Sequence, residues 1–123
     1  MAYFQYQLLQ EQIRIYDVQV DPNDPTHLLA ATMAGVMEKR GAGDWSDRSN
    51  FKYTTVFSVA FDPTDTDGST YYAGTQNYLA KTTNSGTDWT LSDELPNDDF
   101  NDIAIGPGGN TVFATTGKSG GSK

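Results

Sequence analysis

Three short segments of the chain alternate apolar residues with other residues at a period of two. Each segment carries two apolar side chains two positions apart: Val18 and Val20, Val59 and Phe61, and Ile103 and Ile105. This period is typical of a β-strand with one face turned inward. Asp-Pro follows the first two segments and Gly-Pro the third, and proline ends a strand because it has no backbone N–H for the sheet. The pattern therefore predicts three strands that each end in a turn.

These strands open a longer repeat. Asp21, Asp62 and Gly106 stand 41 and 44 positions apart, and each is followed by a segment of small residues that ends in Thr, at 28–32, 71–75 and 112–116. Trp45 and Trp89 are 44 positions apart, and an Asp precedes each of them. Third strands are predicted at 35–39 and 79–82, and a fourth strand begins at each tryptophan. Four antiparallel strands in about 42 residues correspond to one β-propeller blade.

The predicted fold class is therefore all-β, with about two and a half four-stranded antiparallel blades. We assign 1–14 to a strand of a shared blade, 15–55 to a first blade, 56–99 to a second, 100–117 to half of a third, and 118–123 to a flexible tail. Propellers close with four to eight blades, and an open stack exposes sheet edges and apolar faces. We therefore expect the ring to be completed by further copies of the chain or by another protein, or the sequence to be a fragment of a longer propeller.

The turn between the third and fourth strands carries a recognisable motif. The second blade has Thr-Thr-Asn-Ser-Gly-Thr-Asp-Trp at 82–89, whereas the first blade keeps only the Gly-rich turn and the tryptophan, at 38–45. The motif resembles the Ser/Thr-x-Asp-x-Gly-x-Thr-Trp box of the Asp-box, or bacterial neuraminidase repeat, superfamily of β-propellers. That superfamily includes sialidases, xyloglucanase-type glycosidases and sortilin-like receptors. The resemblance implies a structural hairpin turn formed by Thr82, Asn84, Gly86 and Trp89, with Asn84 in the aspartate position.

Composition narrows the function. The chain has 123 residues, 8 basic and 16 acidic side chains and a net charge of −8, which repels nucleic acid. Cysteine is absent, so there is no disulfide framework, and cysteine usage leaves the compartment open. No apolar run reaches the roughly 20 residues of a membrane span, and residues 1–14 do not resemble a signal peptide. The localisation stays open, with a virion or extracellular assembly among the alternatives.

Candidate catalytic and metal residues are few. The single histidine, His27, has no nucleophile or second ligand near it in sequence, and we expect a solvated residue in a turn. Asp62, Asp65 and Asp67 lack the spacing of a calcium loop, which favours a turn held by aspartate side chains. Gly117-Lys118-Ser119 has neither the first glycine nor the following helix of a phosphate-binding loop.

Carbohydrate chemistry has two sets of candidate residues. The cluster of Asp93, Glu94, Asp98 and Asp99 could hold a glycosidase pair of carboxylates, although a solvated acidic loop is the simpler interpretation. Too few arginines are present for a sialidase. A lectin-like contact would use the residues near predicted loops, namely Phe51, Tyr53, Asn77 and Tyr78.

We therefore predict a non-catalytic interaction or assembly module, not an enzyme, without metal or cofactor. Its partner is expected to be a copy of itself or another protein subunit, joined by strand completion and burial between blades. The expected interface consists of Phe4, Tyr6 and Leu8 at the leading edge and of Ile103, Ile105, Val112 and Phe113 at the trailing edge. The alternatives are a carbohydrate-binding module on a virion or cell envelope and, third, a fragment of a glycosidase.

Overall fold

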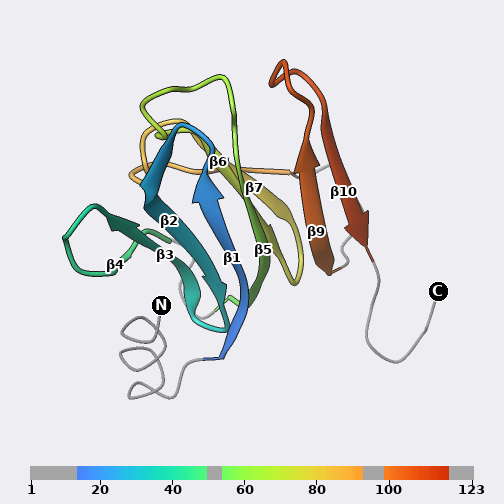
Figure 1. Ribbon diagram of the computed structural model, residues 1–123. Helices are drawn as coiled ribbons and strands as arrows, with labels where there is room; N and C mark the ends of the chain where they lie inside the picture. Colours follow the sequence, from blue (N-terminus) through green and yellow to red (C-terminus); the bar gives the residue numbers. More distant parts are fainter. Residues whose placement is uncertain (1–13, 50–53, 93–98, 117–123) are drawn as a thin grey trace.

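The computed structural model describes residues 14–49, 54–92 and 99–116. They form three antiparallel sheets (Figure 1). Blade 1 consists, in spatial order, of β1 (Ile15–Asp21), β2 (Asp24–Thr32), β3 (Gly35–Arg40) and β4 (Ser46–Asp47). Blade 2 consists of β5 (Val56–Phe61), β6 (Tyr71–Thr75), β7 (Leu79–Thr82) and β8 (Thr90–Leu91). The half-blade consists of β9 (Phe100–Ile105) and β10 (Val112–Thr116). The prediction of an all-β fold built from four-stranded antiparallel blades is confirmed.

The repeated threonines explain why each second strand turns where it does. In blade 1 the Thr32 hydroxyl donates to the carbonyl of Gly35 at 2.8 Å and accepts the N–H of Ala34 at 3.0 Å. In blade 2 the Thr75 hydroxyl donates to the carbonyl of Tyr78 at 2.8 Å and accepts that residue's N–H at 3.0 Å. A hydroxyl that replaces backbone partners in this way stabilises a tight hairpin. The fourth strands begin one residue after each tryptophan, whereas the repeat predicts that they begin at the tryptophan itself.

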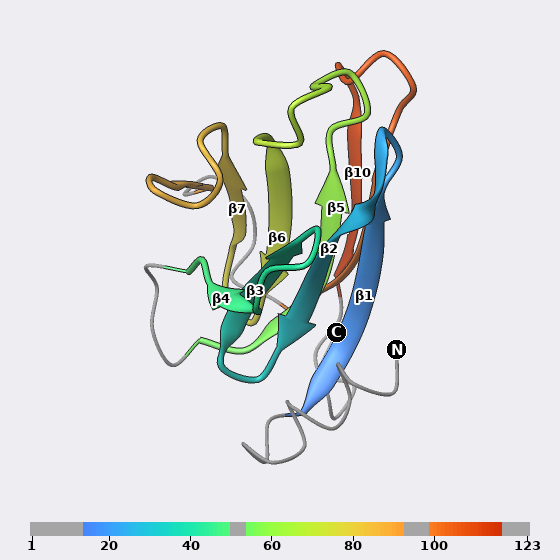
Figure 2. The same ribbon diagram turned by 60° about the vertical axis from the view of Figure 1, so that its left-hand side comes forward.

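The first strands of the three sheets lie next to one another, β1 beside β5 and β5 beside β9. The sheets stand face to face along this row, and their outer strands point away from it (Figures 1 and 2). One face of each sheet therefore meets the preceding sheet, which we call its leading face, and the other meets the following sheet, its trailing face. This stacking of twisted sheets is the arrangement of propeller blades.

Two parts of the predicted organisation differ from the structure or lie outside it. β2 begins at Asp24 rather than at Leu28, so His27 belongs to a strand and not to a turn. The predicted strand of the shared blade, apart from Arg14, and the tail from 118 lie outside the described residues. Within the described ranges, no helix has the length and apolar character needed to cross a membrane.

Candidate functional site

An apolar core joins blade 1 to blade 2. Because side chains alternate along a strand, Leu29 and Ala31 share the trailing face of blade 1, and Val59 and Phe61 share the leading face of blade 2. The buried residues of this core are Leu29, Ala31, Val36, Val56, Val59, Phe61, Tyr71, Ala73 and Ala80. Aromatic rings continue the core outward, since Tyr71 makes edge contacts with Phe61 at 5.9 Å and with Trp89 at 5.7 Å between centroids. Contacts of this kind stabilise beyond the area they bury.

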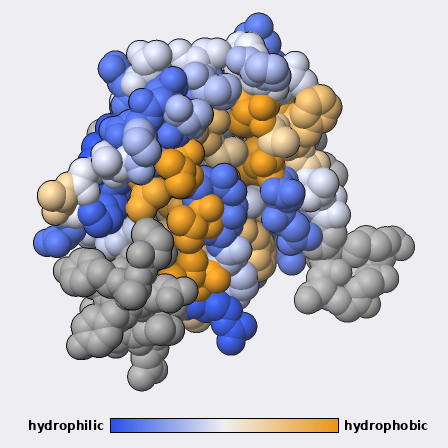
Figure 3. Space-filling view, viewed as in Figure 1, coloured by the Kyte–Doolittle hydropathy of each residue, from blue (hydrophilic) through white to orange (hydrophobic). Residues whose placement is uncertain are grey.

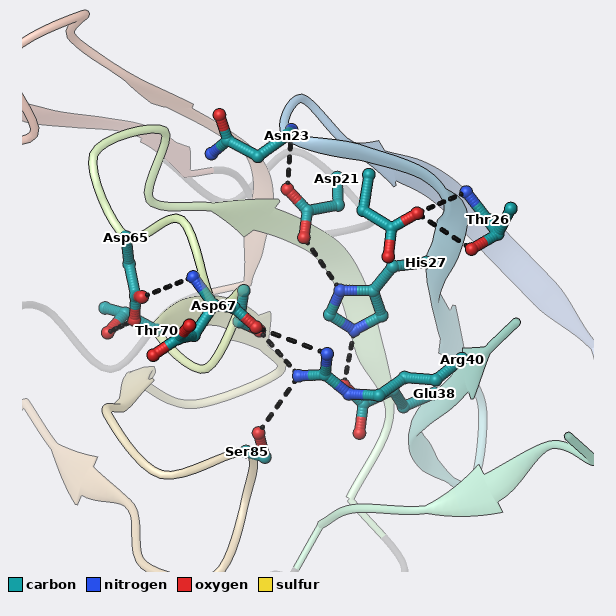
Figure 4. Close-up of polar contacts among 12 residues, drawn as sticks. Asp21, Asn23, Thr26, His27, Glu38, Arg40, Asp65, Asp67, Thr70 and Ser85 are labelled. Carbon is teal, nitrogen blue, oxygen red and sulfur yellow. Dashed lines mark hydrogen bonds and ion pairs between the residues drawn. The ribbon is translucent and has the colours of Figure 1, made fainter.

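His27 lies at one end of this core, fully buried, and the expectation of a solvated residue is wrong. It shares the trailing face of β2 with Leu29 and Ala31. Its Nδ1 lies 2.8 Å from Oδ2 of Asp21, and its Nε2 lies 2.5 Å from Oε2 of Glu38 (Figure 4). Both carboxyl side chains are almost fully buried. A buried polar group without partners is costly, and here each ring nitrogen has one.

Two arginines complete this polar cluster. Nε of Arg48 lies 2.9 Å from Oε1 of Glu38, and Nε of Arg40 lies 3.3 Å from Oε2 of the same side chain. Each contact of the imidazole requires one proton between nitrogen and oxygen, so the ring and its two carboxyls together carry one negative charge. The two guanidinium groups, both about half-exposed, offset that charge at the edge of the joint. We call Asp21, His27, Glu38, Arg40 and Arg48 the joint cluster.

Blade 2 covers the joint cluster with the loop between β5 and β6. Gly68 has a positive φ of 68°, and a Cβ at this position would lie 2.7 Å from Nδ1 of His27 and closer still to Oδ2 of Asp21. Only glycine fits such a conformation at this separation. Arg40 reaches the same loop, because its guanidinium donates to the carbonyls of Asp67 at 3.2 Å and Gly68 at 3.3 Å (Figure 4). The buried side chains of the cluster are therefore enclosed between blade 1, which supplies them, and the β5–β6 loop of blade 2.

The next joint repeats this geometry without the histidine. Gly109 of the half-blade has a positive φ of 75°, and a Cβ there would lie 2.7 Å from Oδ1 of Asp62. Asp62 ends the first segment of blade 2 as Asp21 ends that of blade 1, and Thr70 stands in the place of His27, one residue before the apolar part of the second strand. A glycine of one blade thus lies over the aspartate of the preceding blade at both joints.

Aspartate side chains hold the turns that follow the first strands. Oδ1 of Asp62 accepts the N–H of Thr64 at 2.9 Å, and Oδ1 of Asp65 accepts the N–H of Asp67 at 3.0 Å. The hydroxyl of Thr70 donates to Asp65 at 2.6 Å, and this hydrogen bond lowers the pKa of Asp65 below its ordinary value. These are Asx turns, as predicted. No group of His, Asp and Glu side chains in the described part of the chain is arranged to hold a metal ion.

The turn at 82–89 fastens blade 2 to blade 1. The Thr82 hydroxyl accepts the N–H groups of Asn84 at 3.2 Å and Gly86 at 2.9 Å, while Oδ1 of Asn84 accepts the N–H of Asp88 at 2.9 Å. Nε1 of Trp89 donates to the carbonyl of Arg48 at 2.9 Å, across the joint. Thr82, Asn84, Gly86 and Trp89 therefore form a structural turn whose tryptophan links two blades.

Two sheet faces have no partner sheet among the described residues. Register aligns Val18 with Val59 and Ile103, whose exposed fractions are 39%, 1% and 8%, and it aligns Val20 with Phe61, at 51% and 6%. On the opposite face it aligns Leu29, Tyr72 and Phe113, which are 0%, 7% and 63% exposed. Within the described part of the chain, the leading face of blade 1, apart from the buried Ala30, and the trailing face of the half-blade are thus open. An apolar stripe follows β1 across the surface in Figure 3.

The structure distributes the predicted interface residues unevenly. Phe4, Tyr6 and Leu8 lie outside the described residues. Ile103 is buried against blade 2 within the chain, so it is not available to a partner. Ile105 and Val112 are half-buried, and Phe113 is the most exposed.

Of the candidate carbohydrate residues, the structure describes only Asn77, Tyr78 and Asp99. Asp93, Glu94, Asp98, Phe51 and Tyr53 lie outside the described residues, and Tyr78 packs against the core between the blades. An open groove of about 280 Å³ runs beside the first strands, lined by Gln19, Val20, Pro22, Val59, Ala60, Phe61, Pro63, Ile103 and Ile105. Among these described lining residues, Gln19 supplies the one polar side chain, so the other polar groups that face the groove belong to the backbone.

Comparison with known proteins supports the architecture. No family model matches the sequence, and no curated protein matches it. Among solved structures, an ancestral GH74 enzyme has 30% identity and a TM-score of 0.74, and covers 85% of this chain. The GH74 enzyme of Niastella koreensis has 23% identity and a TM-score of 0.69 over 80% of the chain. The extracellular domain of a hybrid two component system from B. thetaiotaomicron has 19% identity and a TM-score of 0.66 over 85% of it.

The chain spans only 14–16% of the length of these three structures. The likeness therefore concerns successive blades and not a whole protein. Sheet order, stacking and structural similarity agree that the chain has the fold of β-propeller blades.

Proposed function

We propose that this chain is a non-catalytic assembly module that works through its open blade faces. The observation that supports the proposal is the contrast within each set of aligned residues. Val18 and Phe113 are exposed, although both of their counterparts in the other sheets are buried, and Val20 is exposed where Phe61 is buried and Ile105 is half-buried. Burial of apolar surface is the main favourable term in association, so the positions that are buried twice within the chain mark the surfaces that a partner would cover.

A strand edge that has no partner strand among the described residues supports the same proposal. β2 and β6 are each paired on both sides, whereas the described sheet of the half-blade contains only β9 and β10. The outer edge of β10 presents backbone N–H and C=O groups that a further strand can pair with. A partner that adds a strand here would also cover Phe113.

We also propose that the turn at 82–89 is an Asp-box turn. Its hydrogen bonds centre on Thr82 and Asn84, and its tryptophan packs at a joint between blades. Its residues lie in the joint and not in the groove beside the first strands, which supports a structural role.

The mass of the purified chain in solution, combined with binding of a hydrophobic dye, tests the assembly role. We expect either a multiple of 13.4 kDa or a monomer that binds the dye, with less dye bound after Val20→Asp or Phe113→Asp. Both results leave the two faces as surfaces for a partner. A monodisperse monomer that binds no dye would overturn the proposal, because the faces would then be covered within the chain.

A second candidate is a segment of a glycosidase propeller, favoured by the 30% identity to an ancestral GH74 enzyme. In that case the open faces would be covered by further blades of a longer protein. Release of reducing sugar from a panel of plant and microbial polysaccharides would support an enzymatic role. We expect none, because the assembly role requires no pair of catalytic carboxylates.

A further inference from the structure

We propose that the partner of the open faces is a second copy of this chain, docked head to tail. The half-blade of one copy would lie against β1 and β2 of the next, and this inference rests on the proposed assembly role. One chain carries both a leading and a trailing open face, so each copy offers what the other lacks. Contacts of this kind between different surfaces are heterologous and build rings when the rotation closes.

The joint between blades 1 and 2 provides a template for the contact. There, Oδ2 of Asp17 on β1 accepts the backbone N–H of Val59 on β5 at 3.2 Å. In the half-blade, register puts Asp102 at the position of Asp17, because Asp17 pairs with Ala31 and Asp102 with Thr115, each one residue before the final threonine of its strand. Asp102 is exposed, and one of its oxygens accepts the N–H of Ile103 at 3.0 Å. Its other oxygen has the chemistry to accept the N–H of Val18 in the next copy.

Side-chain size at the two faces is complementary. Inside the chain, Leu29 of the trailing face packs in the same core as Phe61 of the leading face. Phe113 replaces the leucine and Val20 replaces the phenylalanine. The trailing position is therefore larger and the leading position smaller than in the internal joint. Exchanges that conserve volume are the ones that packed interfaces tolerate best.

The polar part of the joint is absent from both open faces. Gly106 and Thr111 of the half-blade stand where blade 1 has Asp21 and His27, so this trailing face has no carboxylate or imidazole at those positions. On the leading face of blade 1, β1 and β2 are joined through Pro22 and Asn23 alone, without the glycine loop that covers the joint cluster from blade 2. The trailing face of the half-blade therefore lacks the polar cluster, and the leading face of blade 1 lacks the loop that would cover such a cluster, so the two faces are compatible. Docking of two copies would therefore bury no carboxylate or imidazole at this end, where register places Lys39 beside Leu28 on the leading face.

Each copy supplies three sheets, and each sheet takes one blade position. Two copies would therefore give six positions, within the four to eight of closed propellers, whereas three copies would give nine. We therefore expect a closed assembly of two chains rather than a fibre. Because each copy carries a charge of −8, the copies repel one another at long range, and added salt should strengthen the assembly by screening.

A mixing experiment tests the direction of docking. Val20→Asp blocks the leading face and Phe113→Asp blocks the trailing face, and both residues are exposed, so neither change disturbs the core. Light scattering behind a sizing column should give a closed multiple of 13.4 kDa for the wild type and a monomer for each variant alone. A one-to-one mixture of the two variants should form a dimer with one chain of each. Leu91→Asp, at an exposed position on β8 away from both faces, is the matched control and should keep the wild-type mass.

The absence of cysteine allows an independent test. A variant with both Val20→Cys and Phe113→Cys should form covalent oligomers on mild oxidation, whereas each single variant should give far less. A wild type that stays monomeric at high concentration, or variants that do not associate when mixed, would overturn the inference. A monomer that still binds hydrophobic dye would leave the assembly role in place with a different protein as partner.

Discussion

Replacing His27 by alanine tests whether the joint cluster holds the blades together. The change removes both ring nitrogens, so Asp21 and Glu38 lose the group that lies between them. Glu38 keeps Arg40 and Arg48, whereas Asp21 keeps only the N–H of Asn23, at 2.8 Å, among the contacts described here. The cost therefore falls mainly on Asp21, whose side chain remains buried.

The expected loss of stability follows from these contacts. Removing one partner of a buried ion pair costs about 3–5 kcal/mol. The edge contact of the His27 ring with Phe61, at 4.9 Å between centroids, adds about 1 kcal/mol. Because the half-exposed arginines still stabilise Glu38, we place the total at about 3–5 kcal/mol rather than at the sum of the upper values. The free energy of unfolding of domains of this size is about 5–15 kcal/mol, so the substitution should remove a large part of it.

Urea unfolding followed by fluorescence of Trp45 and Trp89 measures this loss. With a slope of about 1–3 kcal/mol per molar urea, the midpoint should fall by roughly 2 M. Thr111→Ala is the matched control, since Thr111 occupies the position of His27 in the half-blade but is exposed, and it should change stability by less than about 0.5 kcal/mol.

The double variant His27→Ala with Asp21→Asn distinguishes the cost of an unpaired buried carboxylate from the cost of lost packing. It should be more stable than additivity predicts, by about 1–3 kcal/mol, because the second change removes a carboxylate that the first deprived of a partner. A loss below about 1 kcal/mol for His27→Ala, or strict additivity in the double variant, would refute the reasoning that buried charge balance holds this joint.

Three further predictions concern single groups of blade 2. The buried hydroxyl of Tyr71 has no hydrogen-bond partner among the described residues, and burial raises its pKa, so Tyr71→Phe should cost less than about 1 kcal/mol at pH 7. Above pH 10 the unfolded tyrosine ionises while the folded one stays protonated, so stability should fall by about 1.4 kcal/mol per pH unit in the wild type; an equal slope in Tyr71→Phe would contradict this. Thr70→Val should raise the lowered pKa of Asp65 toward 3.8, so the stabilisation from Asp65, which is lost as the pH falls, should be lost at a higher pH; a carboxyl titration followed by NMR that is the same in both proteins would disprove it. Gly68→Ala should destabilise by about 1–3 kcal/mol more than Gly41→Ala, because both have positive φ but only Gly68 has neighbours within 4 Å of a Cβ; equal losses in thermal unfolding would show that the cover is not tight.

The repeat made the blades predictable from sequence because its signals are local. Proline after a strand, threonine at a hairpin and alternating apolar residues each act within a few positions. The inward orientation predicted for Val59 and Phe61 is confirmed. Val18 and Val20 have the same alternation, yet they are exposed because no sheet among the described residues covers them. Alternation specifies which side chains share a face, whereas burial also depends on the neighbouring blade.

The joint cluster cannot be predicted from the neighbours of His27 in sequence, because Asp21 and Glu38 stand 6 and 11 positions away. The alternation of side chains along the strands does indicate that His27 and Glu38 are buried. His27 is two positions before Leu29, and Glu38 is two positions after Val36, so both lie on the buried faces of their strands. The extension of β2 back to Asp24 was hidden by Pro25, which suggested a turn. The cover from Gly68 depends on how two blades stack, and no pattern within one blade indicates it.

The internal joint between blades 1 and 2 and the two open faces differ in how they select the sheet that packs against them. Buried ion pairs add little net stability over apolar packing, but they strongly penalise a wrong partner that leaves a charge unpaired. Blade 1 presents such charges on its trailing face, so only a blade with a glycine loop and carbonyls placed as in blade 2 can cover it. The open faces present apolar side chains together with Asp102 on the trailing face and Lys39 on the leading face, so a partner would be selected there by size and by strand register. The internal joint is therefore the one that fixes the order of the blades within the chain.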